Sequence, residues 1–130
     1  TWGQFKGKNV VLFFYPKDNT PGCTKEAIDF SQQITDFAAQ DTLVVGVSRD
    51  SCASHQRFAA KHNLDLTLIS DPTEEICRAF GVLKKKNMYG KTAIGIERST
   101  FVIDKQGRVS HIWRGVKVPD HASTVLAELS

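Results

Sequence analysis

A run of six consecutive apolar residues, Val-Val-Leu-Phe-Phe-Tyr at positions 10–15, restricts the fold more than any other feature of the sequence. A strand with one face in water alternates between apolar and polar residues, whereas a strand covered on both faces is apolar throughout. A membrane-spanning helix would need about 20 apolar residues. The run therefore predicts a buried strand over residues 9–15, in a sheet with helices packed on both faces.

The rest of the chain alternates between helical and strand patterns. Helices are expected over residues 23–39, 51–62, 72–81 and 119–129, and strands over residues 42–47, 66–69, 99–104 and 109–113. Ser51 is expected to cap the second helix, and the Asp71-Pro72 pair to open the third. Gly107 predicts a hairpin turn between the last two strands. This order predicts a three-layer α/β fold with a mixed central sheet.

Length and charge narrow the class of protein. A chain of 130 residues is long enough for one domain with its own core, and no linker or internal repeat divides it. The net charge is only +3, and we expect the single basic run, Lys84-Lys85-Lys86, to be a solvated loop without nucleic-acid contacts. No signal peptide is recognisable, so a cytoplasmic location is expected.

The three cysteines, at positions 23, 52 and 77, are odd in number and far apart. A secreted disulfide scaffold would have more of them, in an even number, so this pattern indicates a reducing compartment. There is no Cys-x-x-Cys pair, so no zinc site is expected. We expect His111 and His121 at the surface or at strand ends, without a catalytic role.

Cys23 stands where the predicted first strand ends in a turn and a helix begins. A helix N-terminus presents unpaired N–H groups and a partial positive charge, which stabilise a thiolate. Thr20 lies three residues earlier, so its hydroxyl can fold back over the sulfur, and Pro16 stiffens the approach. On these grounds alone, a reactive cysteine and a buried cysteine that merely begins a helix remain equally open.

Pro16, Thr20 and Cys23 match the Pro-x-x-x-Thr-x-x-Cys pattern of the peroxiredoxins. The longer string over residues 14–27, FYPKDNTPGCTKEA, resembles the bacterioferritin-comigratory-protein or peroxiredoxin Q subgroup, and so do residues 68–72, 86–91, 97–104 and 111–114. This resemblance implies a thioredoxin-like fold and a thiol peroxidase that needs no metal, haem or flavin. It also implies that Cys23 is the peroxidatic nucleophile, that Thr20 binds the peroxide, and that Pro16 shields the oxidised sulfur.

The resemblance further assigns two charged residues. Arg98 would favour the Cys23 thiolate and hold a peroxide oxygen with its fork of donors. Glu26, one helical turn after Cys23, would orient that guanidinium. A strand-edge charge remains the alternative for Arg98, and an ordinary first-turn carboxylate remains the alternative for Glu26.

The sequence departs from the subgroup at the resolving cysteine. The positions where relatives carry it correspond to Ile28, Gln56 or Ala59 here. We therefore expect no dedicated resolving residue and recycling by thioredoxin, glutaredoxin or a small thiol. Cys52 is the next choice, because we expect it to be accessible, and Cys77 is the last, because it lies among apolar residues.

Two other functions use similar residues. A thiol–disulfide reductase would need a second cysteine to release its mixed disulfide, and a redox sensor would oxidise Cys23 without turnover. The subgroup also has a further strand-rich segment ahead of the first strand, which we expect to be missing here. A monomer is expected.

Overall fold

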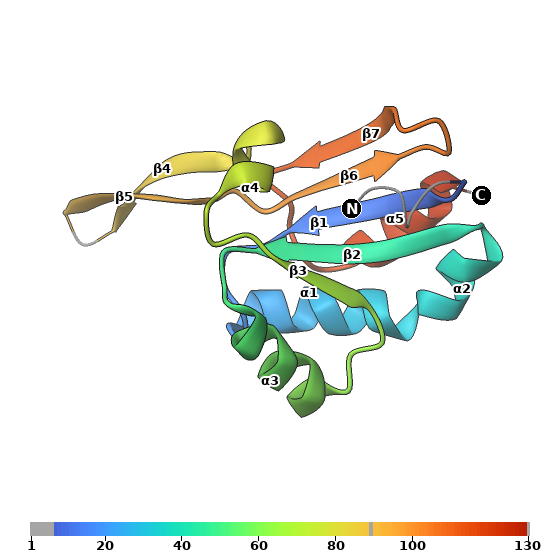
Figure 1. Ribbon diagram of the computed structural model, residues 1–130, viewed down its shortest axis with the longest axis horizontal. Coiled ribbons are helices and arrows are strands. Elements are labelled where there is room, and N and C mark those ends of the chain that lie inside the picture. The colour runs from blue at the N-terminus through green and yellow to red at the C-terminus, as the bar shows by residue number, and fades with distance from the viewer. Residues whose placement is uncertain (1–6, 89, 130) are drawn as a thin grey trace.

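The computed structural model describes residues 7–88 and 90–129 (Figure 1). The described residues do not include residues 1–6 or Tyr89, which belong to segments discussed above. In chain order the elements are β1 (Asn9–Phe14), α1 (Pro21–Gln32), α2 (Ile34–Ala39), β2 (Thr42–Ser48), α3 (Cys52–His62), β3 (Thr67–Ser70), α4 (Glu75–Ala79), β4 (Leu83–Met88), β5 (Lys91–Ile96), β6 (Ser99–Ile103), β7 (Val109–Arg114) and α5 (His121–Leu129). No helix in the described residues combines the length and hydropathy that crossing a membrane requires.

The five-stranded sheet has the order β3-β2-β1-β6-β7. Strand β1 pairs in parallel with β2 and antiparallel with β6, so the sheet is mixed, as predicted. Because β1 is the middle strand, its side chains contact a core on either face. Val11 and Phe13 belong to one core, and Val10, Leu12 and Phe14 to the other, which explains the unbroken apolar run.

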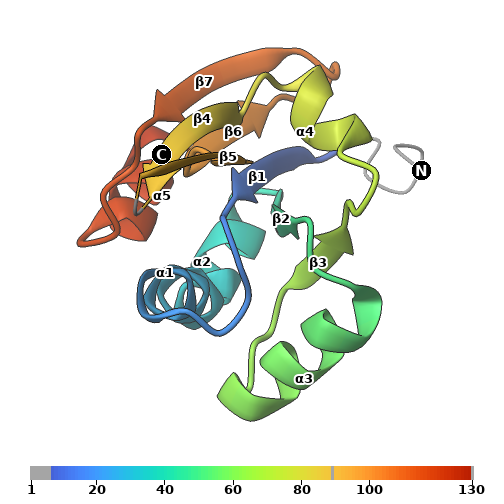
Figure 2. The same cartoon turned by 90° about the vertical axis from the view of Figure 1, so that its left-hand side faces the viewer.

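The two faces of the sheet are covered differently (Figure 2). Helices α1, α2, α3 and α5 contribute Phe30, Phe37, Phe58 and Val125 to one core. On the opposite face lies α4, which contributes its buried residue Cys77 to the second core. The predicted three-layer α/β fold is therefore confirmed, with most of its helices on the face that carries Phe13.

The expected helix over residues 23–39 is wrong in its extent. Helix α1 begins two residues earlier, with Pro21 in its first turn, and ends at Gln32. Gln33 leaves the helical conformation, with φ −104° and ψ 11°, before α2 begins. Apolar spacing continues across this break through Phe30, Ile34 and Phe37, so periodicity alone predicted one helix.

The expected helix start at Pro72 is also wrong. Helix α4 begins at Glu75, after Glu74 has adopted a left-handed conformation with φ +66°. The Asp71 carboxylate accepts hydrogen bonds from the backbone N–H groups of Ile76 and Cys77 instead. Asp71 therefore caps the helix from a distance, and Pro72 remains in the turn.

The segment that begins with Lys84 is strand β4 and not a loop. It pairs with β5 in a two-stranded ribbon that extends away from the main sheet (Figure 1). Lys84 and Lys85 are exposed, as expected. The strand forms by pairing across the turn at Gly90, whose φ is +77°, and the lysine-rich sequence contains no apolar pattern that would predict it.

Candidate active site

The end of β1 delivers the chain to the turn that carries Cys23. Tyr15 continues the sheet by donating its backbone N–H to the carbonyl of Val47. Helix α1 then begins at Pro21, where the missing N–H costs nothing. Cys23 is the third residue of this helix and is only 1% exposed. The predicted position of the cysteine in the first helical turn is confirmed.

Arg98 joins Cys23 to Glu26. Its Nη2 donates to Cys23 Sγ at 3.3 Å, and its Nη1 donates to Glu26 Oε1 at 2.7 Å. Arg98 directly precedes β6, whose first residue pairs with the last residue of β1, so the sheet brings the guanidinium to the start of α1. The structure thus places together three of the residues that the resemblance singled out.

Burial shifts the pKa values of Glu26 and Arg98. It raises the pKa of Glu26 to about 7, although the charge and hydrogen bond of Arg98 act in the opposite direction. Burial also lowers the pKa of Arg98, but Glu26 and the Cys23 sulfur offset that effect, and the net pKa of Arg98 is raised. Arg98 is therefore a permanent cation held against the Cys23 sulfur.

Gly22 is a site residue that sequence reasoning missed. A Cβ atom built on it would lie 3.1 Å from Arg98 Nη2, closer than an ordinary van der Waals contact. The Pro-Gly pair in the sequence indicated only a turn. Its role in leaving room for the guanidinium depends on a residue far away in the sequence.

Thr20 occupies the N-cap position of α1 but does not cap the helix through its side chain. Its hydroxyl donates to the carbonyl of Lys17 at 2.9 Å, and no hydrogen bond to Cys23 is present in the described structure. The expectation that it folds over the sulfur is thus not met here. Pro16 is half-buried in the same loop. With no side-chain cap, the first-turn N–H groups of α1 remain available to an anion.

The other two cysteines lie in contrasting places. Cys77 is fully buried in the core on the opposite face of the sheet from Cys23. Burial, followed by the hydrogen bond and charge of Asp71, raises the pKa of Cys77 to about 12, which keeps it a thiol. Cys52 is exposed at the first residue of α3, as expected, and all three cysteines are free.

His121 is not at the surface as predicted but is 6% exposed. Its Nε2 lies 2.8 Å from the hydroxyl oxygen of Thr100, and its ring packs edge-on against Phe30 and Trp113. Burial, and then the charge of Arg98, lower the pKa of His121 to about 4, so the ring is neutral near pH 7.

Comparisons with known proteins agree with this geometry. The model of the AhpC/TSA family matches residues 1–112. The chain is 51% identical over 123 residues to Peroxiredoxin Bcp of Xanthomonas campestris, a match that covers 95% of this chain and 77% of the relative. It is 50% identical over 126 residues to Peroxiredoxin Bcp of Bacillus subtilis, covering 97% and 80% of the two chains.

The fold agrees as closely as the sequence. A structure of Peroxiredoxin Q from Xanthomonas campestris matches with a TM-score of 0.95 at 50% identity, over 99% of this chain and 82% of that one. The thioredoxin-like fold implied by the resemblance is therefore confirmed. Together with the cysteine–arginine pair, these matches establish that the chain belongs to the AhpC/TSA family and is a peroxiredoxin of the Bcp or PrxQ subgroup, a thiol-dependent peroxidase.

Proposed function

We propose that Cys23 is the peroxidatic residue of this enzyme. The observation that carries the proposal is its sulfur, buried in the first turn of α1 with a guanidinium N–H 3.3 Å away. A positive charge at that distance favours the thiolate, which is the nucleophilic form. The thiolate attacks one oxygen of the peroxide and the O–O bond breaks. The sulfur becomes a sulfenic acid, and the second oxygen leaves as water or an alcohol after taking up a proton.

The surrounding groups would act on the two peroxide oxygens. Arg98 and the uncapped N–H groups of α1 would stabilise the charge that develops on the leaving oxygen. Glu26 would hold the guanidinium in place through its 2.7 Å hydrogen bond. Thr20 would bind peroxide after its hydroxyl turns away from the Lys17 carbonyl, and Pro16 would shield the oxidised sulfur.

We base the proposed class of peroxide substrate on a related protein. The bacterioferritin comigratory protein of Xanthomonas campestris, 49% identical to this chain, is described for its alkyl peroxide reduction activity. We propose that this enzyme reduces organic hydroperoxides and hydrogen peroxide.

We further propose that an outside thiol, from thioredoxin, glutaredoxin or a small molecule, reduces the sulfenic acid. Cys77 lies on the other face of the sheet, which speaks against it as a resolving residue. Cys52 is exposed and is the remaining candidate within the chain. A monomer in the cytoplasm is part of the same proposal.

Peptide mass spectrometry under non-reducing conditions tests the assignment. One equivalent of hydrogen peroxide is added with a sulfenic-acid trap present, and the three cysteines are compared. We expect Cys23 alone to be trapped within seconds, and Cys23→Ser to abolish peroxide consumption while Cys52→Ser retains it with an external thiol.

The alternative outcomes separate the hypotheses. A Cys23–Cys52 disulfide would leave the peroxidatic role standing but replace the outside thiol by Cys52. Equal reactivity of the three cysteines would refute the role of Cys23. Oxidation of Cys23 without repeated turnover, in the presence of thioredoxin and of small thiols, would favour a redox sensor.

A further inference from the structure

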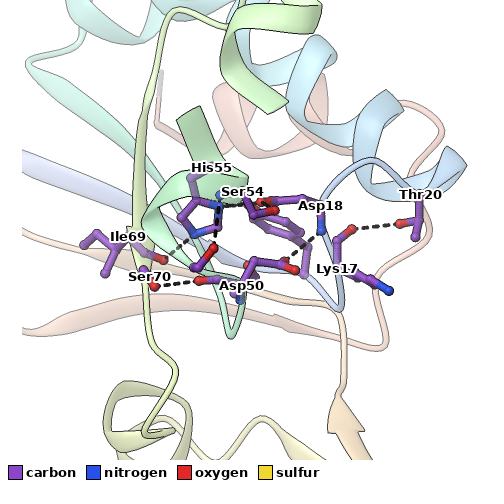
Figure 3. A network of polar contacts seen from close by, with 11 residues as sticks. Lys17, Asp18, Thr20, Asp50, Ser54, His55, Ile69 and Ser70 are labelled. Carbon is purple, nitrogen blue, oxygen red and sulfur yellow. Dashed lines mark hydrogen bonds and ion pairs between the residues drawn. The ribbon is translucent and has the colours of Figure 1, made fainter. Parts of the chain in front are cut away.

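A buried polar network joins the loop that precedes Cys23 to helix α3 (Figure 3). The Tyr15 hydroxyl donates to Asp18 Oδ1 at 2.6 Å. The other oxygen of Asp18 accepts from the Ser54 hydroxyl at 2.8 Å and lies 2.7 Å from His55 Nδ1. Tyr15, Asp18 and His55 are at most 6% exposed. The network is therefore shielded from water, where electrostatic interactions are strong.

Both ring nitrogens of His55 have a partner in this network. Its Nε2 lies 3.1 Å from the carbonyl oxygen of Ile69, which can only accept, so Nε2 carries a proton. Asp18 accepts one hydrogen bond from Tyr15 and one from Ser54, so both of its oxygens are held. The short contact between Asp18 Oδ2 and His55 Nδ1, at 2.7 Å, completes a buried hydrogen-bonded cluster.

Backbone groups tie the same loop to the sheet. The N–H of Asp18 donates to Asp50 Oδ2 at 2.8 Å, and Ser48 donates to the same oxygen at 2.6 Å. The carbonyl of Asp50 accepts from the Ser70 hydroxyl at the end of β3 (Figure 3). Asp18, Asp50 and His55 could in principle hold a cation, but their ligand atoms are already hydrogen-bonded to one another or to their neighbours, so we assign no metal here.

This network resists the movement that recycling requires. At 1% exposure, the Cys23 sulfur is out of reach of any outside thiol, and a disulfide with Cys52 also needs the two residues to come close. The first turn of α1 must therefore open after oxidation. Asp18 lies five residues before Cys23, so opening that extends to Asp18 would separate it from His55 and leave buried polar groups without their hydrogen-bond partners.

We propose that Asp18 and His55 are positioning residues that clamp the loop of Cys23 to α3. The clamp stabilises the closed arrangement, in which Cys23 lies beside Arg98 and reacts with peroxide, over an open arrangement in which oxidised Cys23 meets a thiol. The proposal rests on the proposed role of Cys23. It predicts that weakening the clamp slows oxidation and accelerates reduction, whereas general damage to the site slows both.

The test compares Asp18→Asn and His55→Asn with the wild type. His62→Asn is the matched control, because His62 is on the same helix and contacts Asn19 of the same loop, but through a hydrogen bond that is exposed to solvent. Rapid-quench mass spectrometry measures the oxidation of Cys23 by hydrogen peroxide. A second experiment measures how fast 5-thio-2-nitrobenzoate converts the sulfenic acid to a mixed disulfide and water.

Both clamp variants are expected to oxidise about tenfold more slowly and to be reduced several-fold faster, while the control stays within about twofold of the wild type in both steps. Unchanged rates, or rates that fall together, would overturn the clamp. If the wild type itself fails to oxidise at Cys23, the proposed function fails, and the rate comparison no longer bears on the clamp.

A second measurement needs no clamp variant and no peroxidase activity. In a Cys52→Ser background, thiol–disulfide exchange with 5,5′-dithiobis(2-nitrobenzoate) converts Cys23 to a mixed disulfide and releases one 5-thio-2-nitrobenzoate, and hydrogen exchange is followed by NMR. The backbone N–H of Asp18 and the ring N–H groups of His55 are expected to exchange at least about tenfold faster than in the reduced protein. Equal exchange in the two forms would show that the clamp does not respond to the state of Cys23.

Discussion

The guanidinium of Arg98 contacts two side chains that lie 72 and 75 positions away in the sequence. Its planar fork allows one nitrogen to face Glu26 while the other faces the Cys23 sulfur. At the residue scale, the site therefore depends on the shape of this group as well as on its charge, and on the space that Gly22 leaves for it.

Arg98→Lys tests the need for the fork. A lysine keeps the charge but has a single ammonium group, so it cannot reproduce both hydrogen bonds. The rate of Cys23 oxidation by peroxide is expected to fall about a hundredfold, by analogy with the loss of one positioned donor. Arg108→Lys, at an exposed position in the β6–β7 turn, is the control and should leave the rate unchanged. A wild-type rate for Arg98→Lys would show that charge alone suffices.

Gly22→Ala tests the need for space. Alanine is the better helix former by up to about 1 kcal/mol, which opposes the cost of the close contact, so the free energy of unfolding should change little. Its Cβ, 3.1 Å from Arg98 Nη2, should displace the guanidinium and slow the oxidation of Cys23 about tenfold. Stopped-flow oxidation and urea unfolding measure the two effects. An unchanged rate would show that the Arg98 guanidinium can move aside without slowing the oxidation of Cys23.

At the scale of elements, strand β2 illustrates how the sheet restricts sequence. Gly46 lies opposite Phe13 on β1 and Leu68 on β3. A Cβ at position 46 would lie 2.7 Å from Phe13 Cζ and 2.9 Å from Leu68 Cδ2. The ring of Phe13 therefore occupies the space that a side chain on β2 would need, and glycine is required by packing and not by backbone conformation.

Gly46→Ala is expected to lower the free energy of unfolding by about 1–3 kcal/mol through overpacking. Phe13→Leu removes part of the obstacle, so the double variant should lose less stability than the sum of the two single variants. Urea unfolding of the four proteins measures this difference. Additive losses would mean that Phe13 is not the limiting contact.

At the scale of the whole molecule, two buried titratable groups affect stability in opposite directions. Glu26 has its pKa raised from 4.5 to about 7, so the folded protein binds the extra proton between these values and loses stability as the pH rises through them. His121 has its pKa lowered from 6.5 to about 4, so the unfolded chain binds the extra proton and stability increases as the pH rises through that window. Each effect is on the order of 3 kcal/mol, and the two largely offset one another.

Replacing Glu26 or His121 should separate their opposing contributions to the pH dependence of stability. The stability advantage of the wild type over Glu26→Gln is expected to shrink as the pH rises from 4.5 to 7. Its advantage over His121→Gln is expected to grow as the pH rises from 4 to 6.5. The wild type and each variant share all other titratable groups. The difference between their free energies of unfolding, measured by urea unfolding across this pH range, therefore isolates the contribution of the replaced group. Parallel stability curves would contradict the proposed charge states.

Local sequence patterns predicted the central strand, the position of Cys23 in a first helical turn, and the order of most elements. These features are local, because burial on both faces, helical periodicity and the turn residues leave their mark within a few positions of the chain. The resemblance added Arg98 and Glu26, which the structure brings to Cys23 as expected.

Local patterns did not predict the break at Gln33, the burial of His121 or the role of Gly22, which depend on packing between distant parts of the chain. The contact between Asp18 and His55 also depends on the tertiary structure, since the two residues are 37 positions apart. Apolar periodicity reports that a residue is buried but not what it is buried against. Contacts between distant residues depend on the order of strands in the sheet, and that order is set by the packing of the whole chain.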